Sequence, residues 1–82
     1  MTFDPPRYRR TATGANRYRI EADDRFTELQ RLGRRWLVHV VRDAPYPERV
    51  RIAEMLDGLG GTFVEDDPAD FERILLEAEG QG

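Results

Sequence analysis

The side chains that most often carry out enzymatic chemistry are scarce in this sequence. It contains no Ser, Cys or Lys, so three of the usual nucleophiles are absent. One histidine, His39, remains, and it is accompanied by neither a second His nor a carboxylate pair of specific spacing. A catalytic or metal-binding histidine needs partners of matching geometry. We therefore expect His39 to be an ordinary strand residue and the protein not to be an enzyme.

Acidic residues gather at 65–67 and at Asp70, which raises the question of a cation site. Their spacing lacks the Gly and the bidentate Glu of an EF-hand loop. Helix capping explains them more simply, with Asp67 as the N-cap, Pro68 as the first helical residue and Asp70 in the first turn. No metal ion or other cofactor is expected.

The charge of the chain is unevenly distributed. All thirteen basic residues are Arg, a bias that we attribute to the GC-rich genome of a bacterium or its phage. Residues 1–51 hold twelve of them against seven acids, a net charge of +5, whereas residues 52–82 hold one Arg against nine acids, a net charge of −8. Such asymmetry indicates either charged partners or neutralisation of one half by the other within a monomer.

Two candidate docking surfaces follow from this asymmetry. The basic surface combines an N-terminal Arg/Tyr cluster with arginines of the expected strands; it comprises Arg7, Tyr8, Arg9, Arg10, Arg17, Arg19, Arg34 and Arg35. The acidic surface belongs to the C-terminal part of the chain; it comprises Glu65, Asp66, Asp70, Glu72 and Glu77.

These surfaces favour a non-catalytic protein-interaction module, a small regulator or inhibitor that docks on a larger protein, because complementary charge speeds encounter. One alternative is nucleic-acid binding through the Arg-rich N-terminal arm and sheet face, since Arg reads phosphate and guanine. The net charge of −3 argues against it as the default. The other alternative is a homodimer, in which the acidic helix of one copy meets the basic sheet of another.

The strongest strand signal lies in residues 35–42, where apolar and mostly β-branched side chains follow one another. Because strand side chains alternate between faces, Trp36, Val38 and Val40 share one face of this strand. The opposite face is also mainly apolar, so we expect both faces to be covered and residues 35–42 to form the central strand of a sheet.

The neighbouring segments are expected to pair with this strand. Residues 17–22 alternate, with Tyr18 and Ile20 facing the core and Arg17, Arg19 and Glu21 facing water. Residues 25–32 are ambiguous: a three-residue apolar spacing favours a helix, but the Gly33 turn into the next strand favours a strand, which we choose. Residues 62–65 are β-prone and could add a fourth strand.

Two C-terminal helices are expected, at about 47–59 and 67–79, each with an apolar stripe at helical spacing. The glycine-rich residues 58–61 close the first helix and do not form a phosphate-binding loop, which would open one. The fold class is therefore α+β, with a small antiparallel sheet of three to four strands in one layer and two helices in another. The expected core comprises Tyr18, Ile20, Trp36, Val38, Val40, Ile52, Leu56, Leu59, Phe71, Ile74 and Leu75.

The chain divides into a flexible basic arm (1–16), one compact domain (17–79) and a frayed tail (80–82). Pro5-Pro6 argues against regular structure in the arm. The sequence has no signal-peptide pattern and no apolar run near the ~20 residues that span a bilayer. We therefore expect a cytoplasmic protein without a membrane partner.

Overall fold

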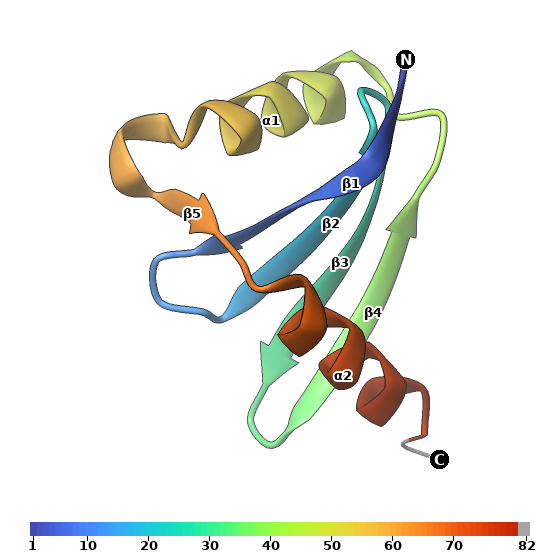
Figure 1. Ribbon diagram of the computed structural model, residues 1–82, viewed down its shortest axis with the longest axis vertical. Helices are drawn as coiled ribbons and strands as arrows, with labels where there is room; N and C mark the ends of the chain where they lie inside the picture. The colour runs from blue at the N-terminus through green and yellow to red at the C-terminus, as the bar shows by residue number, and fades with distance from the viewer. Residues whose placement is uncertain (81–82) are drawn as a thin grey trace.

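The chain forms one antiparallel sheet with two α-helices, and the computed structural model describes residues 1–80. The strands are β1 (Thr2–Thr11), β2 (Asn16–Ala22), β3 (Arg25–Leu32), β4 (Arg35–Val41) and β5 (Phe63–Glu65), in the order β4-β3-β2-β1-β5. The helices are α1 (Tyr46–Asp57) and α2 (Pro68–Glu79), and a short 3-10 helix, η1 (Leu59–Gly61), follows α1 (Figure 1). The expected α+β class is confirmed, with five strands in place of three or four.

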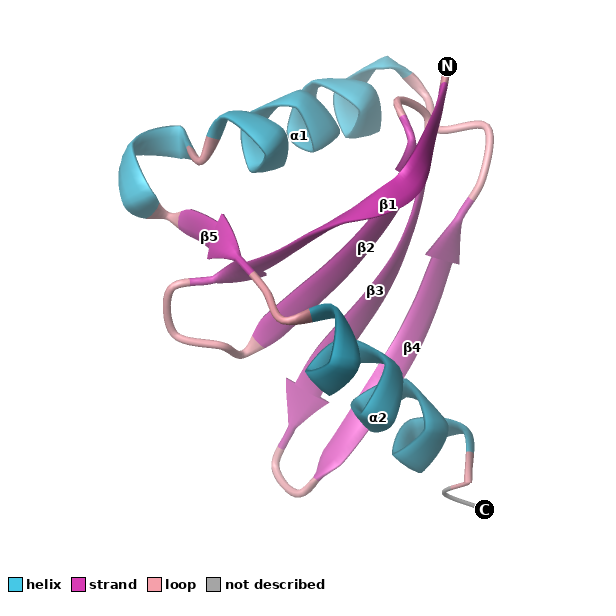
Figure 2. Ribbon diagram, viewed as in Figure 1, coloured by secondary structure: helices cyan, strands magenta, loops and turns pink. Residues whose placement is uncertain are grey.

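The two helices cover opposite faces of the sheet. Tyr18 and Ile20 of β2 point to one face, where they pack with Ile52 and Met55 of α1. Because side chains alternate along a strand, Arg19 points to the other face, where α2 crosses in front of β3 and β4 (Figure 2). We call these the α1 face and the α2 face. The helices thus form two layers instead of the single one expected.

The apolar pattern of strand β3 is explained by helices on both faces of the sheet. Residues 25–32 form a strand, as we favoured over a helix. Phe26 and Leu29 lie three positions apart, so they point to opposite faces. Phe26 packs on the α1 face, and Leu29 packs against Phe71 on the α2 face. The three-residue spacing that suggests a helix therefore reflects a strand buried on both sides.

The turn between β3 and β4 is the hairpin expected from the sequence. Leu32 pairs with Arg35, which leaves Gly33 and Arg34 as a two-residue turn. Gly33 has a φ of 62°, a left-handed conformation that costs a glycine little. Glycine at the first central position is typical of the II′ turn, whose twist matches the flanking strands.

Strand β4 lies at an edge of the sheet, so the expectation that residues 35–42 are central is wrong. It pairs with β3 along its length and, among residues 1–80, with no strand on its other side. Its apolar side chains are consequently only partly covered: 38% of Val38 and 54% of Val40 remain exposed, and Trp36 is half-buried. Val38 and Val40 therefore do not belong to the buried core, and Trp36 only borders it.

Residues 2–11 form strand β1 inside the sheet, where the sequence indicated a flexible arm over 1–16. Arg7 to Arg10 pair with β2 on one side, and Arg9 to Thr11 pair with β5 on the other. The two prolines that argued against a strand lie where the β1–β2 register shifts and where β5 does not reach. Proline is tolerated at such positions because the ladder needs no donor there.

Both helices begin and end close to the expected residues. The N-cap of α2 is Asp67, whose carboxylate accepts a hydrogen bond from the Ala69 N–H at 2.9 Å, and Pro68 is its first residue. Helix α1 ends at Asp57, and Gly58 follows as its C-cap with a φ of 92°. Leu59 therefore lies in η1, where 45% of it is exposed, outside the core. The expected frayed tail lies outside the described residues except for Gly80.

The buried core includes five of the expected residues and adds several from β3 and α1. Tyr18, Ile20, Ile52, Phe71 and Ile74 are buried. Leu56 and Leu75 are partly buried at its border. The additional buried residues are Ala22, Phe26, Thr27, Leu29, Ala44, Met55 and Ala78.

Candidate functional site

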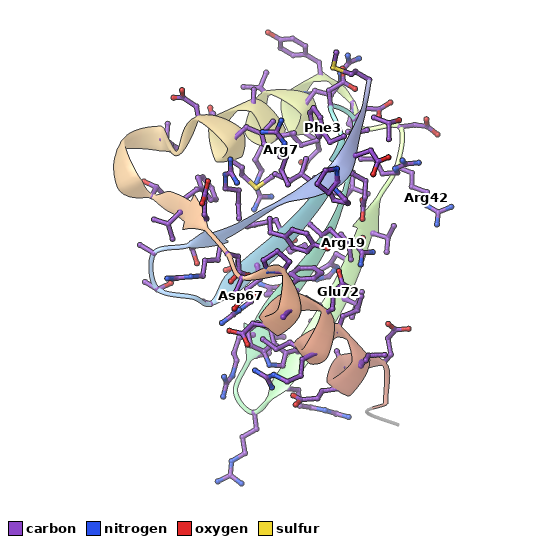
Figure 3. All side chains as sticks on the ribbon, in the orientation of Figure 1. Phe3, Arg7, Arg19, Arg42, Asp67 and Glu72 are labelled. Atoms are coloured by element: carbon purple, nitrogen blue, oxygen red, sulfur yellow. The ribbon has the colours of Figure 1, made fainter. Side chains whose placement is uncertain are left out.

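A polar network lies between the sheet and α2, on the α2 face. Arg19 donates to both carboxylate oxygens of Glu72 at 2.9 and 3.0 Å and, through Nε, to Glu21 at 2.8 Å. The Tyr8 hydroxyl donates to Glu72 at 2.7 Å, and the Thr27 hydroxyl donates to Glu21 at 3.0 Å. Figure 3 shows Arg19 of β2 directed toward Glu72 of α2. The network therefore ties three strands to the C-terminal helix.

The pKa values in this network favour its charged carboxylate and its neutral phenol. Burial alone would raise the pKa of Glu72, but the hydrogen bonds from Tyr8 and Arg19 outweigh it and lower that pKa. Burial would likewise lower the pKa of Arg19, but bonds to Glu21 and Glu72 raise it. Burial, followed by the bond to Glu72, raises the pKa of Tyr8 to about 12. A carboxylate that stays ionised and accepts several hydrogen bonds contributes to stability and is poorly suited to proton transfer.

A second ion cluster joins the loop before α2 to β1 and β2. The Asp66 carboxylate, whose side chain is 2% exposed, accepts from Arg17 at 3.0 Å and lies 3.9 Å from Arg10. Burial raises its pKa in spite of these arginines. The guanidinium of Arg17 also lies 5.9 Å from the Trp36 ring centroid. The acidic segment is thus packed onto the basic strands within one chain.

Six of the thirteen expected site residues are brought together, and their partners are one another. Tyr8, Arg10, Arg17 and Arg19 of the basic surface are the partners of Asp66 and Glu72 of the acidic surface. Of the remaining basic residues, Arg7 lies exposed over the Phe3 ring, and Arg9 donates to the Tyr8 carbonyl. Arg34 and Arg35 are exposed at the β3–β4 turn. Of the remaining acidic residues, Glu65 is exposed at the end of β5, and Asp70 and Glu77 pair with Arg73.

The buried phenol of Tyr18 and the partly buried phenol of Tyr8 predict a loss of stability at alkaline pH. Burial raises the pKa of Tyr18 to about 12, with the Glu28 charge adding to it, and that of Tyr8 is also about 12. An unfolded tyrosine ionises near pH 10. The folded protein binds these two protons more tightly, so the stability that they contribute is complete below pH ~10 and is lost between about pH 10 and 12.

Phenolate absorbance near 295 nm and far-UV circular dichroism, followed together in a Tyr46→Phe variant, measure this loss. The variant retains only Tyr8 and Tyr18. We expect phenolate to form together with unfolding, with little of either below pH ~10. Phenolate formation by both residues near pH 10 in a protein that stays folded would contradict the expectation.

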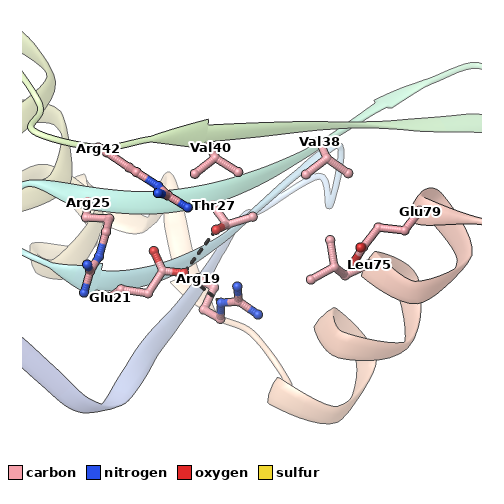
Figure 4. A pocket seen from close by; sticks show the side chains of 9 residues that line it. All are labelled: Arg19, Glu21, Arg25, Thr27, Val38, Val40, Arg42, Leu75 and Glu79. Carbon is pink, nitrogen blue, oxygen red and sulfur yellow. Dashed lines mark hydrogen bonds and ion pairs between the residues drawn. The ribbon is translucent and has the colours of Figure 1, made fainter.

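A groove of about 490 Å³ runs between β4 and α2, next to the polar network (Figure 4). Val38 and Val40 of β4 and Leu75 of α2 form its apolar walls. Arg25 and Arg42 lie at one end and Glu79 at the other, as Figure 4 shows. Its other lining residues are Arg19, Glu21 and Thr27.

The groove and the edge of β4 were missed by sequence reasoning, which placed Val38 and Val40 in the core. The available signal was the arginines that flank the apolar run, since charged residues mark edge strands. Among residues 1–80, the side chains of Arg25, Arg34 and Arg42 make no hydrogen bond or ion pair. These guanidiniums, and not the ones buried under α2, are available to a partner.

His39 is exposed on β4, and its Nε2 lies 3.2 Å from the Gln30 side-chain oxygen. Within residues 1–80, no group of three or more His, Cys, Asp or Glu side chains is arranged to hold a metal ion. Neither helix in this part of the chain has the length and apolar character needed to cross a bilayer.

No protein-family model, curated protein or solved structure matches the chain.

Proposed function

We propose that this protein is a non-catalytic interaction module, a small regulator or inhibitor that docks on a larger protein through strand β4. The observation that carries the proposal is that no strand of residues 1–80 pairs with the outer edge of β4. β4 presents seven residues, and Leu37, Val38 and Val40 are each 38–54% exposed. Natural sheets usually protect such an edge, because its unpaired backbone groups pair readily with another chain.

The other edge of the sheet is protected by proline and by a short strand, since the part of β1 that β5 does not reach carries Pro5 and Pro6. β5 has only three residues, and it is followed within three residues by helix α2. A short edge strand offers few backbone groups to a second chain. The contrast between a short edge at β5 and a long apolar edge at β4 supports docking at β4.

The charge pairing within the chain weakens the nucleic-acid alternative. Arg10, Arg17 and Arg19 would be natural phosphate ligands, but carboxylates of Asp66 and Glu72 already neutralise them. A polyanion would have to displace these carboxylates and would meet the remaining negative charge of the C-terminal half. The same pairing engages the acidic residues that a helix-to-sheet homodimer would use.

The test compares two valine-to-lysine variants as baits in lysate of the source organism, with and without nuclease treatment. Val40→Lys places a charge on the β4 edge, and Val50→Lys makes the same change on α1, at a site that is 38% exposed. We expect the wild type and Val50→Lys to retain the same discrete protein and Val40→Lys to lose it. The captured protein, once purified, should bind the wild type in sedimentation velocity runs.

Two results would overturn the proposal. One is equal capture of that protein by Val40→Lys, provided that both variants melt like the wild type. The other is recovery of nucleic acid whose removal by nuclease abolishes all protein capture, which would move nucleic-acid binding to first place.

A further inference from the structure

We propose that the edge of β4 takes up, as a sixth strand, an extended segment of the partner protein in which apolar side chains alternate and acidic residues stand at both ends. The inference rests on the proposed docking function and specifies its ligand. It is carried by three features of β4: an outer edge that no strand of residues 1–80 pairs with, a groove with apolar walls on its α2 face, and arginines without an ion-pair partner near both of its ends.

The backbone edge provides affinity. β4 pairs with β3 from Arg35 to Val41 without a register shift. Its outer edge therefore has the regular backbone geometry that an added strand needs. A strand added to such an edge gains main-chain hydrogen bonds, while pockets for alternate side chains select its sequence. A segment of seven residues would match the length of β4.

The α2 face supplies the side-chain sites. Val38 lies between two hollows, one shared with Val40 and Leu75 and the other shared with Trp36 and Ala78. In the view of Figure 1, the C-terminal turns of α2 project past β4. Residues i and i+2 of an added strand point to one face. Two alternate apolar side chains of the segment would therefore face these hollows.

The ends of the edge supply the charge preference. Arg42 and Arg25 share the groove at one end of β4, and Arg34 is exposed in the turn at the other. None of the three has an ion-pair partner among the described residues. Acidic residues at both ends of the segment complement these guanidiniums. Glu79 lines the helix side of the groove, so the middle of the segment should be uncharged.

The same arginines argue against a second copy as the occupant. If two β4 edges paired antiparallel over their full length, Arg42 of each copy would meet Arg34 or Arg35 of the other. This places like charges against each other at both ends of the interface, which destabilises a sheet. An acidic segment from another protein gains attraction at the two places where a second copy suffers repulsion.

Binding of labelled seven-residue peptides, measured by fluorescence anisotropy at low salt, tests the inference. The probe is Asp-Thr-Val-Thr-Val-Thr-Asp, whose two Val and two Asp share one face of a strand, the charge control replaces both Asp with Lys, and the backbone control is the probe N-methylated at every Val and Thr. We expect the probe to bind at least about tenfold more tightly than either control. The Val40→Lys variant should bind the probe more weakly than the wild type by a similar factor, and the Arg49→Glu variant, changed on α1, should bind it as tightly as the wild type.

The double variant Arg34→Glu/Arg42→Glu should reverse the preference, so that the Lys-flanked peptide binds more tightly than the probe. Equal binding of the two peptides to the wild type, equal binding of the N-methylated probe, or a wild-type dimer dispersed by Val40→Lys would overturn the inference. If no peptide binds but capture of the whole partner still depends on Val40, the inference fails and the docking function stands. If capture is indifferent to Val40→Lys, the docking function fails.

Discussion

Replacing Phe71 with alanine is expected to lower the free energy of unfolding by about 3–5 kcal/mol, the largest effect of any single truncation on the α2 face. Phe71 is fully buried and packs against Leu29. Its ring makes an edge-to-face contact with Tyr8 at 5.4 Å and lies 5.6 Å from the Arg19 guanidinium. The truncation would leave a cavity under α2, because the sheet cannot collapse into the space.

Denaturant unfolding measures this loss, and Leu76→Ala is the matched control. Leu76 lies on the same helix, but 72% of it is exposed. We expect its truncation to change stability by no more than about 0.5 kcal/mol. Similar losses in the two variants would show that α2 is not held by Phe71.

Replacing Arg19 with methionine is expected to cost about 2–4 kcal/mol, because two carboxylates lose their shared cation. Glu21 and Glu72 both bond to Arg19, and the Glu21 side chain is only 18% exposed. Methionine retains an apolar stem over Phe71, so the loss reports on charge more than on packing. The partial exposure of these groups places the expectation below that for a fully buried pair.

A double-mutant cycle that combines Arg19→Met with Glu72→Gln measures the interaction energy between Arg19 and Glu72. We expect Glu72→Gln to cost less in the Arg19→Met background than in the wild type, by about 1 kcal/mol or more. Arg73→Met is the control, since Arg73 makes two ion pairs at a side-chain exposure of 59% and should contribute about 0.5 kcal/mol or less. An Arg19→Met variant as stable as Arg73→Met would show that Arg19 contributes no more to stability than an exposed ion pair does.

Local pattern predicted the elements of this fold better than their arrangement. The strand from Arg25, the Gly33 turn, the Asp67 cap and the stripe of α2 are each specified by residues within a few positions of one another. The order of strands is not local. An apolar run is typical of a central strand, but here the strand lies at an edge and a helix covers one of its faces. Within residues 35–42, only the flanking arginines indicate this position.

The polar face of β2 shows the same limit. Arg17, Arg19 and Glu21 alternate with core residues, which normally indicates a face in water. In the structure they lie under α2, because Asp66 and Glu72, about fifty positions later, satisfy the arginines. The opposite charges of the two halves were the only signal of this contact, and charge alone does not specify which residues meet.

The place of β1 between β2 and β5 has a consequence for the order in which the structure can assemble as the chain is synthesised. β1 to β4 form a meander whose neighbours are joined by short turns, so each strand can pair as soon as the next one emerges. β5 pairs with β1, and Arg9 can meet Glu65 only after the segment between them has been made. Contacts between such distant segments form late, because closing the intervening loop costs entropy. β5 thus completes a sheet whose strands β1 to β4 can pair earlier in synthesis.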